Sequence, residues 1–279
     1  MPTTDKVWFI TGASSGFGRA FARHAIARGH RVVATARAPE KLDDLVQLAP
    51  ECVAAVRLDV NRLADADTAV AAARQRFGRI DVLINNAGFA VVGALEETSD
   101  ADLRAQMETN FFGAMAVTRA ALPLFRAQRF GAIVNISSMG GQMSFPGFSA
   151  YSASKFALEG ASEALAQEMA PFGVKVLIVE PGAFRTELVG SAMREMPQIA
   201  AYADVVGPTR AFAHDMHQTQ AGDPAKAAAA IEAAIEAKDT PLRLVLGSDA
   251  VDAIRAHAQR LLAELAGWEE TARATAFDG

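Results

Sequence analysis

The sequence predicts an α/β fold, in which a doubly wound parallel sheet of about seven strands carries helices on both faces. Short apolar runs rich in β-branched residues alternate with segments of helical periodicity along most of the chain. These runs are continuously apolar, which is typical of parallel strands buried on both faces. Because crossovers between parallel strands are right-handed, successive units wind helices onto the two faces of the sheet.

The elements are expected in alternation up to residue 180. The apolar runs predict strands at 7–10, 32–36, 52–58, 81–87, 131–137 and 175–180. Helical patterns between them predict helices at about 18–28, 40–49, 64–77, 103–125 and 151–170. Each unit of strand and helix has the spacing of a crossover that returns the chain to a parallel sheet.

The pattern changes after residue 186. The segment 187–222 is mixed, and a stretch of this length inside one domain is typically a functional lid, so we expect a substrate-binding lid there. The alternative is a surface insertion with short helices. Asp223 and Pro224 are typical of a helix start. The apolar run at 242–247 predicts a seventh strand.

The C-terminal segment predicts an amphipathic helix that closes a single domain spanning 1–279. Apolar residues recur there at helical spacing up to about residue 270. They are Val251, Ile254, Ala258, Leu261, Leu265 and Trp268.

Composition excludes several classes of function. With 27 Lys and Arg against 32 Asp and Glu, the net charge is -5, which is unfavourable for binding nucleic acid or anionic membranes. No apolar stretch reaches the ~18 residues of a membrane span, and the N-terminus does not resemble a signal peptide, so a cytoplasmic location is expected. A single cysteine, Cys52, excludes a disulfide within the chain. The histidines form no ligand cluster, since only His214 and His217 are close in sequence, so no metal site is expected.

A glycine-rich loop, TGASSGFG at 11–18, follows the first strand and opens the first helix. Glycines at 12, 16 and 18 permit a tight turn and a close backbone approach to a pyrophosphate. The helix N-terminus supplies N–H donors and the positive end of a dipole. This position therefore predicts a dinucleotide site, although a plain tight turn would use the same residues.

Together with NNAG at 85–88 and YSASK at 151–155, this loop resembles the short-chain dehydrogenase/reductase family over nearly the whole chain. The resemblance implies a Rossmann-like fold and a nicotinamide cofactor. It assigns cofactor contacts to residues of four loops and of the YSASK motif. These are Gly12, Ser14, Ser15, Gly16, Phe17, Gly18, Asp59, Val60, Asn86, Ala87, Gly88, Tyr151, Lys155, Pro181, Gly182 and Thr186.

The end of the second strand favours NADP(H) over NAD(H). A carboxylate there would bind the adenosine ribose and repel a 2′-phosphate, but this strand ends in ATAR, with Arg37 and no acidic residue before Glu40. A guanidinium binds phosphate through two charge-assisted hydrogen bonds. The alternative is a solvated arginine after a strand. Some family members carry a second basic residue where this chain has Ser15, so discrimination would depend mostly on Arg37.

The motif YSASK places a phenol and an ammonium on one face of a helix, because Tyr151 and Lys155 are four positions apart. Reduction of a carbonyl needs a proton donor within ~3 Å of the oxygen. A phenol has a pKa of about 10, and a nearby cation is expected to lower it.

The resemblance adds two further catalytic residues. The family's serine lies thirteen positions before the tyrosine, which selects Ser138 rather than Ser137. It would hydrogen-bond the substrate oxygen. Asn110, inside the predicted long helix, would hold a water molecule that connects Lys155 to solvent. With all four positions filled, the resemblance implies an active enzyme.

The residues expected around the substrate are mostly apolar, which favours a hydrophobic ketone, aldehyde or alcohol. They are Phe89, Gly140, Met143, Phe145, Phe148, Ala183, Val189, Met193 and Met196. Two alternatives stay open: a ketoreductase for acyl groups on a carrier protein or coenzyme A, docked by Arg19, Arg185 and Arg194, and a non-catalytic regulator that senses NADPH. Family members commonly form homodimers or homotetramers through two helices, for which 111–117 and 153–166 are apolar enough.

Overall fold

Seven parallel strands form one sheet in the computed structural model, which describes residues 5–277. The six strands expected up to residue 180 are confirmed, with ends that differ by one or two residues. The strands are β1 (Val7–Ile10), β2 (Arg31–Ala36), β3 (Val53–Arg57), β4 (Val82–Asn85), β6 (Gly131–Ile136), β7 (Val174–Pro181) and β9 (Arg243–Leu246). The Rossmann-like fold class predicted from the sequence is therefore confirmed.

The strand order in the sheet is β3-β2-β1-β4-β6-β7-β9. The chain first winds outward from β1 to β3 and then returns to continue on the other side of β1. In doubly wound folds, ligands bind beyond the carboxyl ends of the strands where this winding reverses. That point lies between β1 and β4, directly beside the glycine-rich loop.

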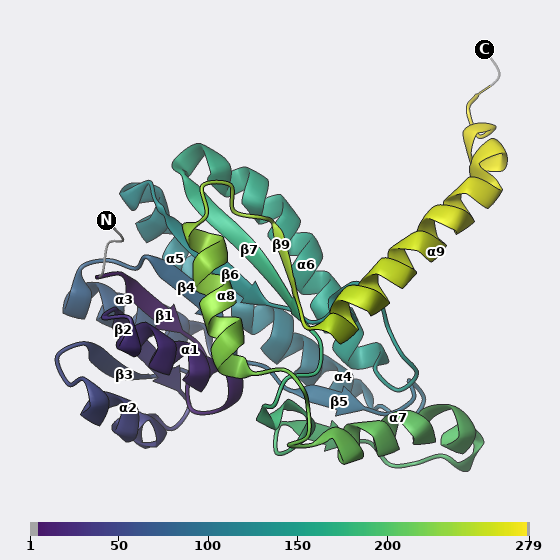
Figure 1. The fold of residues 1–279 in the computed structure, drawn as a ribbon, viewed down its shortest axis with the longest axis horizontal. Coiled ribbons are helices and arrows are strands. Elements are labelled where there is room, and N and C mark those ends of the chain that lie inside the picture. The colour runs from purple at the N-terminus through teal and green to yellow at the C-terminus, as the bar shows by residue number, and fades with distance from the viewer. Residues whose placement is uncertain (1–4, 278–279) are drawn as a thin grey trace.

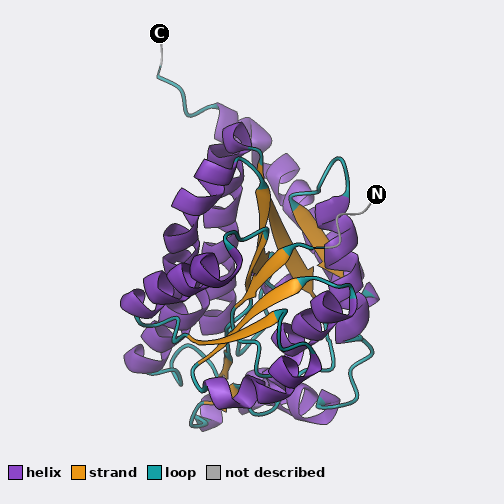
Figure 2. Cartoon of the chain, turned by 90° about the vertical axis from the view of Figure 1, so that its left-hand side faces the viewer, coloured by secondary structure: helices purple, strands orange, loops and turns teal. Residues whose placement is uncertain are grey.

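Helices cover both faces of the sheet, as the side view in Figure 2 shows. On one face lie α1 (Gly16–Ala27), α2 (Asp43–Leu48) and α8 (Pro224–Glu236), whose buried residues join one apolar cluster. On the other lie α3 (Leu63–Phe77), α5 (Ala114–Gln128) and α6 (Ser149–Met169), with a second cluster. Short 3-10 helices lie at Pro39–Leu42, Met139–Gly141 and Ala170–Phe172.

The strands are mostly apolar because most of their side chains reach one of these two clusters. Along β1, Trp8 and Ile10 belong to the first cluster, and Val7 and Phe9 to the second. All four are fully buried. Burying such a side chain stabilises the fold by about 1.5–3 kcal/mol, so the sheet fixes the positions of the loops at its edge.

The long helix expected from residue 103 is confirmed, but it is not α-helical throughout. The structure has α4 (Asp100–Met107), a π-helical segment, η2 (Glu108–Gly113), and then α5. Ser99 begins the run as an N-cap, because its hydroxyl accepts a hydrogen bond from the Asp102 backbone N–H at 3.1 Å. Wider turns of this kind are frequent at functional sites.

The segment 187–222 contains the 3-10 helices η5 (Glu187–Val189) and η6 (Ala200–Tyr202), the strand β8 (Met193–Glu195) and α7 (Ala203–Met216). The sequence analysis did not predict that β8 pairs in parallel with β5 (Ala90–Val92). Buried Glu97 fixes this segment to the body, because its carboxylate accepts hydrogen bonds from the Ile199 backbone N–H and the Arg210 guanidinium, both at 2.8 Å.

The C-terminal helix α9 (Ser248–Arg273) forms, but it does not close the domain as expected. It projects away from the body into solvent (Figure 1). Of its residues only Ala250 is buried, whereas Leu261, Leu265 and Trp268 are 51%, 61% and 69% exposed. The prediction failed because helical spacing shows that a helix has an apolar face without showing what that face contacts. Within residues 5–277, no helix is long and apolar enough to cross a membrane.

Candidate active site

The glycine-rich loop connects β1 to α1 in a tight turn that excludes side chains. Gly12 has φ +67°, a left-handed conformation that favours glycine, and a Cβ on Gly18 would lie 2.3 Å from the Gly12 carbonyl oxygen. The neighbouring strand supports the loop, because Asn86 Nδ2 donates to the Thr11 carbonyl at 2.9 Å. Sequence analysis did not single out Thr11, although its hydroxyl accepts hydrogen bonds from the Asn86 and Ala87 backbone at 2.8 and 3.0 Å.

The N-terminus of α1 leaves its backbone donors available to an anion. Ser15 is the N-cap residue, but its side chain makes no capping hydrogen bond, and no acidic residue occurs in the first turn. The first N–H groups of a helix without such a cap need another partner, and a phosphate group suits them. The loop after β7 lies close by, since a Cβ on Gly16 would be 3.4 Å from Thr186 Cβ.

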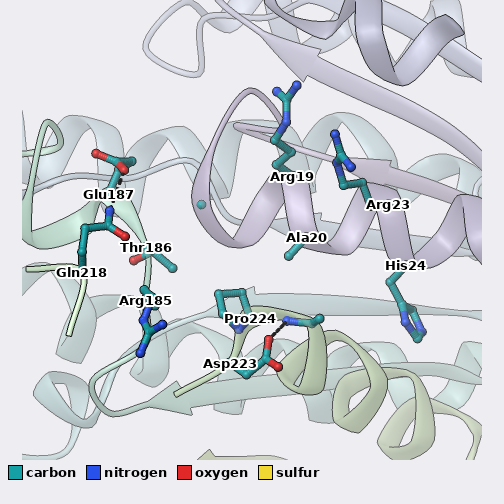
Figure 3. Close-up of a pocket in the computed structure, with 12 residues that line it drawn as sticks. Arg19, Ala20, Arg23, His24, Arg185, Thr186, Glu187, Gln218, Asp223 and Pro224 are labelled. Atoms are coloured by element: carbon teal, nitrogen blue, oxygen red, sulfur yellow. Dashed lines mark hydrogen bonds between the residues drawn. The ribbon is translucent and has the colours of Figure 1, made fainter. Parts of the chain in front are cut away.

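A hollow of about 540 Å³ lies beside this loop, between α1, the segment 185–187 and the start of α8 (Figure 3). Arg19, Arg23 and Arg185 line it, together with Gly16 and Thr186 of the expected cofactor site. Arg19 and Arg23 both form ion pairs with Asp44. The hollow therefore adjoins the glycine-rich loop, and Tyr151 does not line it.

Aromatic packing holds the glycine-rich loop and the start of α1 against the loop after β7. The Phe17 ring stacks on Phe21 at 5.4 Å and contacts Phe184 at 5.1 Å between ring centroids. Sequence analysis assigned no role to Phe184. It also missed Asp249, the second residue of α9, whose carboxylate accepts a hydrogen bond from the Ala183 backbone N–H at 2.7 Å. Ala183 and Phe184, which follow Pro181 and Gly182 at the end of β7, are therefore held from two sides.

The expected adenosine contacts lie at the ends of β2 and β3. Arg37 is exposed, and within the described residues its guanidinium forms no hydrogen bond or ion pair. Asp59 accepts a hydrogen bond from the Asn61 backbone N–H at 3.2 Å, so it also stabilises a local turn. Val60 is buried against Gly113 of the π-helical segment, where a Cβ would lie 2.8 Å from its Cγ2.

Tyr151 lies in the first turn of α6, with 7% of its surface exposed. Ser138 follows β6, and its hydroxyl accepts a hydrogen bond from the Gly140 backbone N–H at 3.0 Å. A Cβ on Gly140 would lie 3.3 Å from Tyr151 Cε1 and 3.4 Å from Ser138 Oγ. The two hydroxyl-bearing residues therefore converge on a space that a glycine leaves open. The neighbouring Ser137 points elsewhere, to Glu159.

Lys155 is buried one turn after Tyr151. Its ammonium donates to the Ile136 carbonyl at 2.8 Å and lies 5.7 Å from the centroid of the Tyr151 ring. Burial lowers the pKa of Lys155 to about 8, and the negative charge of Glu159 partly opposes this. A lysine held this way can exchange a proton near neutral pH.

The pKa of Tyr151 is not lowered as the sequence analysis expected. Burial raises it to about 12, and a polar contact with the Ser138 side chain offsets only part of the effect. The reason is that a buried phenolate loses its hydration, while the Lys155 ammonium donates to a backbone carbonyl instead of the phenol. The protein side chains alone thus keep Tyr151 protonated, as a proton donor requires.

Asn110 lies in the π-helical segment and connects the loop between β4 and β5 to α6. Its amide donates to the Phe89 carbonyl at 3.0 Å and to Ser154 Oγ at 3.1 Å, and its Oδ1 accepts from the Phe89 backbone N–H at 3.1 Å. Gly88 leaves room for it, since a Cβ there would lie 3.0 Å from Asn110 Oδ1. The Asn110 side chain therefore fixes the β4–β5 connection next to α6.

Behind these residues lies a charged cluster that the sequence analysis missed. Glu159 and Glu180, 2% and 1% exposed, both form ion pairs with Arg243 of β9. Gln142 donates to both carboxylates, at 2.5 and 3.0 Å. The available signal was the spacing of Glu159, four residues after Lys155 on the same helix face.

The apolar positions expected around the substrate do not all lie together. The Phe148 ring contacts Tyr151 edge-on at 5.9 Å, and Phe89 packs in a small cluster with buried Met196. Met193 belongs to β8, while Phe145 is exposed. The remaining positions, Met143, Ala183 and Val189, range from buried to half-buried. Among residues 5–277, no group of three metal-ligating side chains is found.

The family model of the short chain dehydrogenases matches residues 6–197, which is more than half of the chain. The chain belongs to the short-chain dehydrogenase family. This covers the glycine-rich loop, the NNAG motif and α6 with its YSASK motif, so the family resemblance predicted from the sequence is confirmed.

Individual proteins match this one over almost its full length. A short-chain dehydrogenase structure from Streptomyces avermitilis is 54% identical, with a TM-score of 0.93, and the match covers 98% of this chain and 100% of the other. Oxidoreductase BOA17 of Botryotinia fuckeliana (strain B05.10) is 41% identical over 97% of this chain and 99% of its own. A short-chain dehydrogenase/reductase from Burkholderia phymatum in complex with NAD is 25% identical, with a TM-score of 0.83 and coverage of 95% and 97%.

Proposed function

We propose that this protein is an NADP(H)-dependent oxidoreductase that interconverts a hydrophobic ketone or aldehyde and its alcohol, with Tyr151 as the general acid and base. The observation that carries the proposal is the convergence of Tyr151, Ser138 and Lys155. A buried phenol lies beside a second hydroxyl, with an ammonium of perturbed pKa one helical turn away. Perturbed groups of complementary charge are typical of sites that move protons.

Each side chain has a distinct task in this proposal. Tyr151 carries the proton that the substrate oxygen needs, and burial keeps that proton in place at neutral pH. Ser138 orients the substrate oxygen toward the phenol through its hydroxyl. Lys155 stabilises the phenolate that forms once the proton has left. A bound nicotinamide ring would supply the hydride chemistry.

The glycine-rich loop suits a dinucleotide, because its backbone donors lack a side-chain cap and its glycines allow a close approach. We assign the preference for NADP(H) to Arg37. Its exposed guanidinium follows β2 and has no carboxylate partner among residues 5–277. Since a hydrogen bond to a charged group is worth about 1.5–3 kcal/mol, losing Arg37 should lower the affinity for NADPH about 10- to 100-fold.

An apolar environment around Tyr151 supports a hydrophobic substrate. Phe148 contacts the Tyr151 ring directly, and Phe89 and Met196 extend the apolar surface toward β5 and β8. A sugar would leave most of its hydroxyl groups without partners against such a surface, which costs free energy.

The test is turnover of a graded panel of ketones and aldehydes, followed through the absorbance of NADPH, with NADH in parallel. Tyr151→Phe should abolish turnover. Tyr202→Phe is the matched control, because it removes the chain's other phenol, whose hydroxyl only donates to Glu96. Equal activity in Tyr151→Phe and the unchanged protein would refute the proposed general acid. Faster turnover with NADH than with NADPH would refute the role of Arg37.

Carrier-linked and coenzyme A-linked 3-oxoacyl substrates belong in the same panel. Arg19 and Arg185 line the hollow beside the phosphate loop, which gives an acidic carrier one basic surface to approach. A strong preference for these substrates over free ketones would make the ketoreductase the better description. Tight binding of NADPH without turnover of any substrate would favour a regulator that senses the cofactor.

A further inference from the structure

Beyond Ile254, which is half-buried, the apolar face of α9 lies uncovered on a helix that projects from the body (Figure 1). With 26 residues it extends for about 39 Å. Its large apolar side chains are more exposed toward the tip, from 37% at Val251 to 69% at Trp268. Exposed apolar surface of this extent on one element marks an interaction site.

Six apolar residues of α9 are spaced alternately by three and four positions, and Leu262, 66% exposed, lies beside this row. This is the heptad pattern of two helices that pack side by side. Val251, Ala258 and Leu265 occupy one of the two seam positions, and Ile254, Leu261 and Trp268 the other.

We propose that α9 pairs with α9 of a second copy of this chain, and that the two helices run antiparallel. In this arrangement each seam residue faces the complementary position of the partner helix. The facing pairs are Val251 with Trp268, Ile254 with Leu265, and Ala258 with Leu261. The bulkiest residue is matched with a smaller one, and the alanine with a leucine, so the layers have similar volumes.

A parallel pair would fit much less well. It would place Ala258 against the same alanine of the partner, which leaves a gap, and Trp268 against the same tryptophan. It would also bring Glu264 of one helix next to Glu269 of the other, with like charges across the seam. The antiparallel arrangement instead places His257 beside Glu264, and both flank the seam. Charge and volume therefore both select the antiparallel direction.

The base of α9 is fixed firmly enough to orient such a pair. Asp249 hydrogen-bonds the Ala183 backbone, and Ala250 is buried in the body. The base leaves Val251 partly exposed, where the Trp268 side chain of the partner would pack. The two bodies would then lie at opposite ends of a two-helix rod.

The first test compares molar masses by light scattering. Leu261→Glu with Leu265→Glu adds two charges to the seam, while Ala256→Glu with Ala263→Glu adds the same charges to the opposite face of the same helix. All four residues are exposed, so the fold of the body should be unaffected. The seam variant is expected to have half the mass of the unchanged protein, and the control to keep the full mass. A single-copy mass for the unchanged protein, or an unchanged mass in the seam variant, overturns the proposal.

The second test measures the direction of the helices by distances between spin labels. In a Cys52→Ser background, single cysteines at Asp252 and at Gln259 lie on one side of α9, outside the seam. An antiparallel pair offsets the two labels along the rod by about 22 Å for Asp252→Cys and by about 2 Å for Gln259→Cys. The Gln259→Cys distance should therefore be clearly the shorter. Equal distances at the two positions would show a parallel pair and refute the proposed arrangement.

Discussion

Two buried clusters in this molecule pair carboxylates with cationic or imidazole side chains, with opposite results for the pKa of the carboxylates. Between α1 and α8, Glu232 accepts hydrogen bonds from His24 at 2.8 Å, His30 at 2.9 Å and Arg28 at 3.2 Å. Behind the catalytic helix, Glu159 and Glu180 must share Arg243. One cluster has more donors than carboxylates, and the other has more buried carboxylates than guanidinium groups.

This difference in balance reverses the direction of the pKa shifts. Burial raises the pKa of Glu232, but the hydrogen bonds from His30 and His24 outweigh it, and the pKa falls below its ordinary value. For Glu180, burial and the negative charge of Glu159 together outweigh Arg243, and the pKa rises. The comparison teaches that burial alone does not decide protonation. We expect the Glu232 cluster to contribute mainly to the free energy of unfolding. The Glu159 cluster should mainly influence the pKa of Lys155 and so the proposed proton transfer.

The largest effect should come from Lys155→Met, which removes the ammonium but keeps an unbranched side chain. Turnover is expected to fall about 10²- to 10⁴-fold, the usual contribution of a general acid–base group. Stability should fall less than at Glu232, because burial lowers the pKa of Lys155 and the folded protein therefore holds this charge at a cost. Steady-state kinetics and thermal unfolding measure the two effects. A large loss of stability with little loss of turnover would show that the division between the clusters is wrong.

Glu232→Ala should give the opposite result. It leaves His24, His30 and Arg28 without their shared partner, and the free energy of unfolding should fall by about 3 kcal/mol. Because the folded pKa of Glu232 is lowered, its contribution is present above the unfolded pKa near 4.5 and is lost as the pH falls through the folded value. Urea unfolding at several pH values tests this. A variant as stable as the unchanged protein at pH 7 contradicts the prediction.

Glu159→Gln should change the pH dependence of turnover more than its maximum. The charge of Glu159 raises the pKa of Lys155, so its removal should move the descending limb of the profile to lower pH, by about one unit. Glu163→Gln is the matched control, since Glu163 is 52% exposed and also pairs with Arg243. If the descending limb moves equally in both variants, the loss of an ion pair with Arg243 causes the change, and the charge of Glu159 next to Lys155 does not.

The smallest effect is expected for Glu180→Gln, about 1 kcal/mol or less. The raised pKa means that the contribution of Glu180 to stability is present below pH 4.5 and is lost as the pH rises through the folded value. The variant should therefore gain stability relative to the unchanged protein as the pH rises above 4.5 and through the folded pKa. This trend is the reverse of that expected at Glu232. If the change in stability with pH had the same sign in Glu180→Gln and Glu232→Ala, the two clusters would not differ as proposed.

Much of the fold could be predicted from the sequence because its signals are local. The apolar strands, the glycine-rich loop and the spacing of Tyr151 and Lys155 each depend on nearby residues. The geometry of the candidate site depends on distant ones. Glu159 meets Arg243 from β9, and β5 pairs with β8 a hundred residues later. No periodicity in one segment reports such a partner, and for the same reason the uncovered face of α9 was expected to be covered.

The π-helical segment Glu108–Gly113 has a consequence for how this chain can change. A π turn holds one residue more than the α-helical turn on either side of it. The chain could therefore lose a single residue here and return to a regular α-helix while α4 and α5 keep their packing. Asn110 would then leave its place opposite Phe89 and Ser154. A one-residue deletion elsewhere in a helix shifts every later side chain to another face. Here it would leave the protein folded and remove only the contacts of Asn110 that the proposed activity uses.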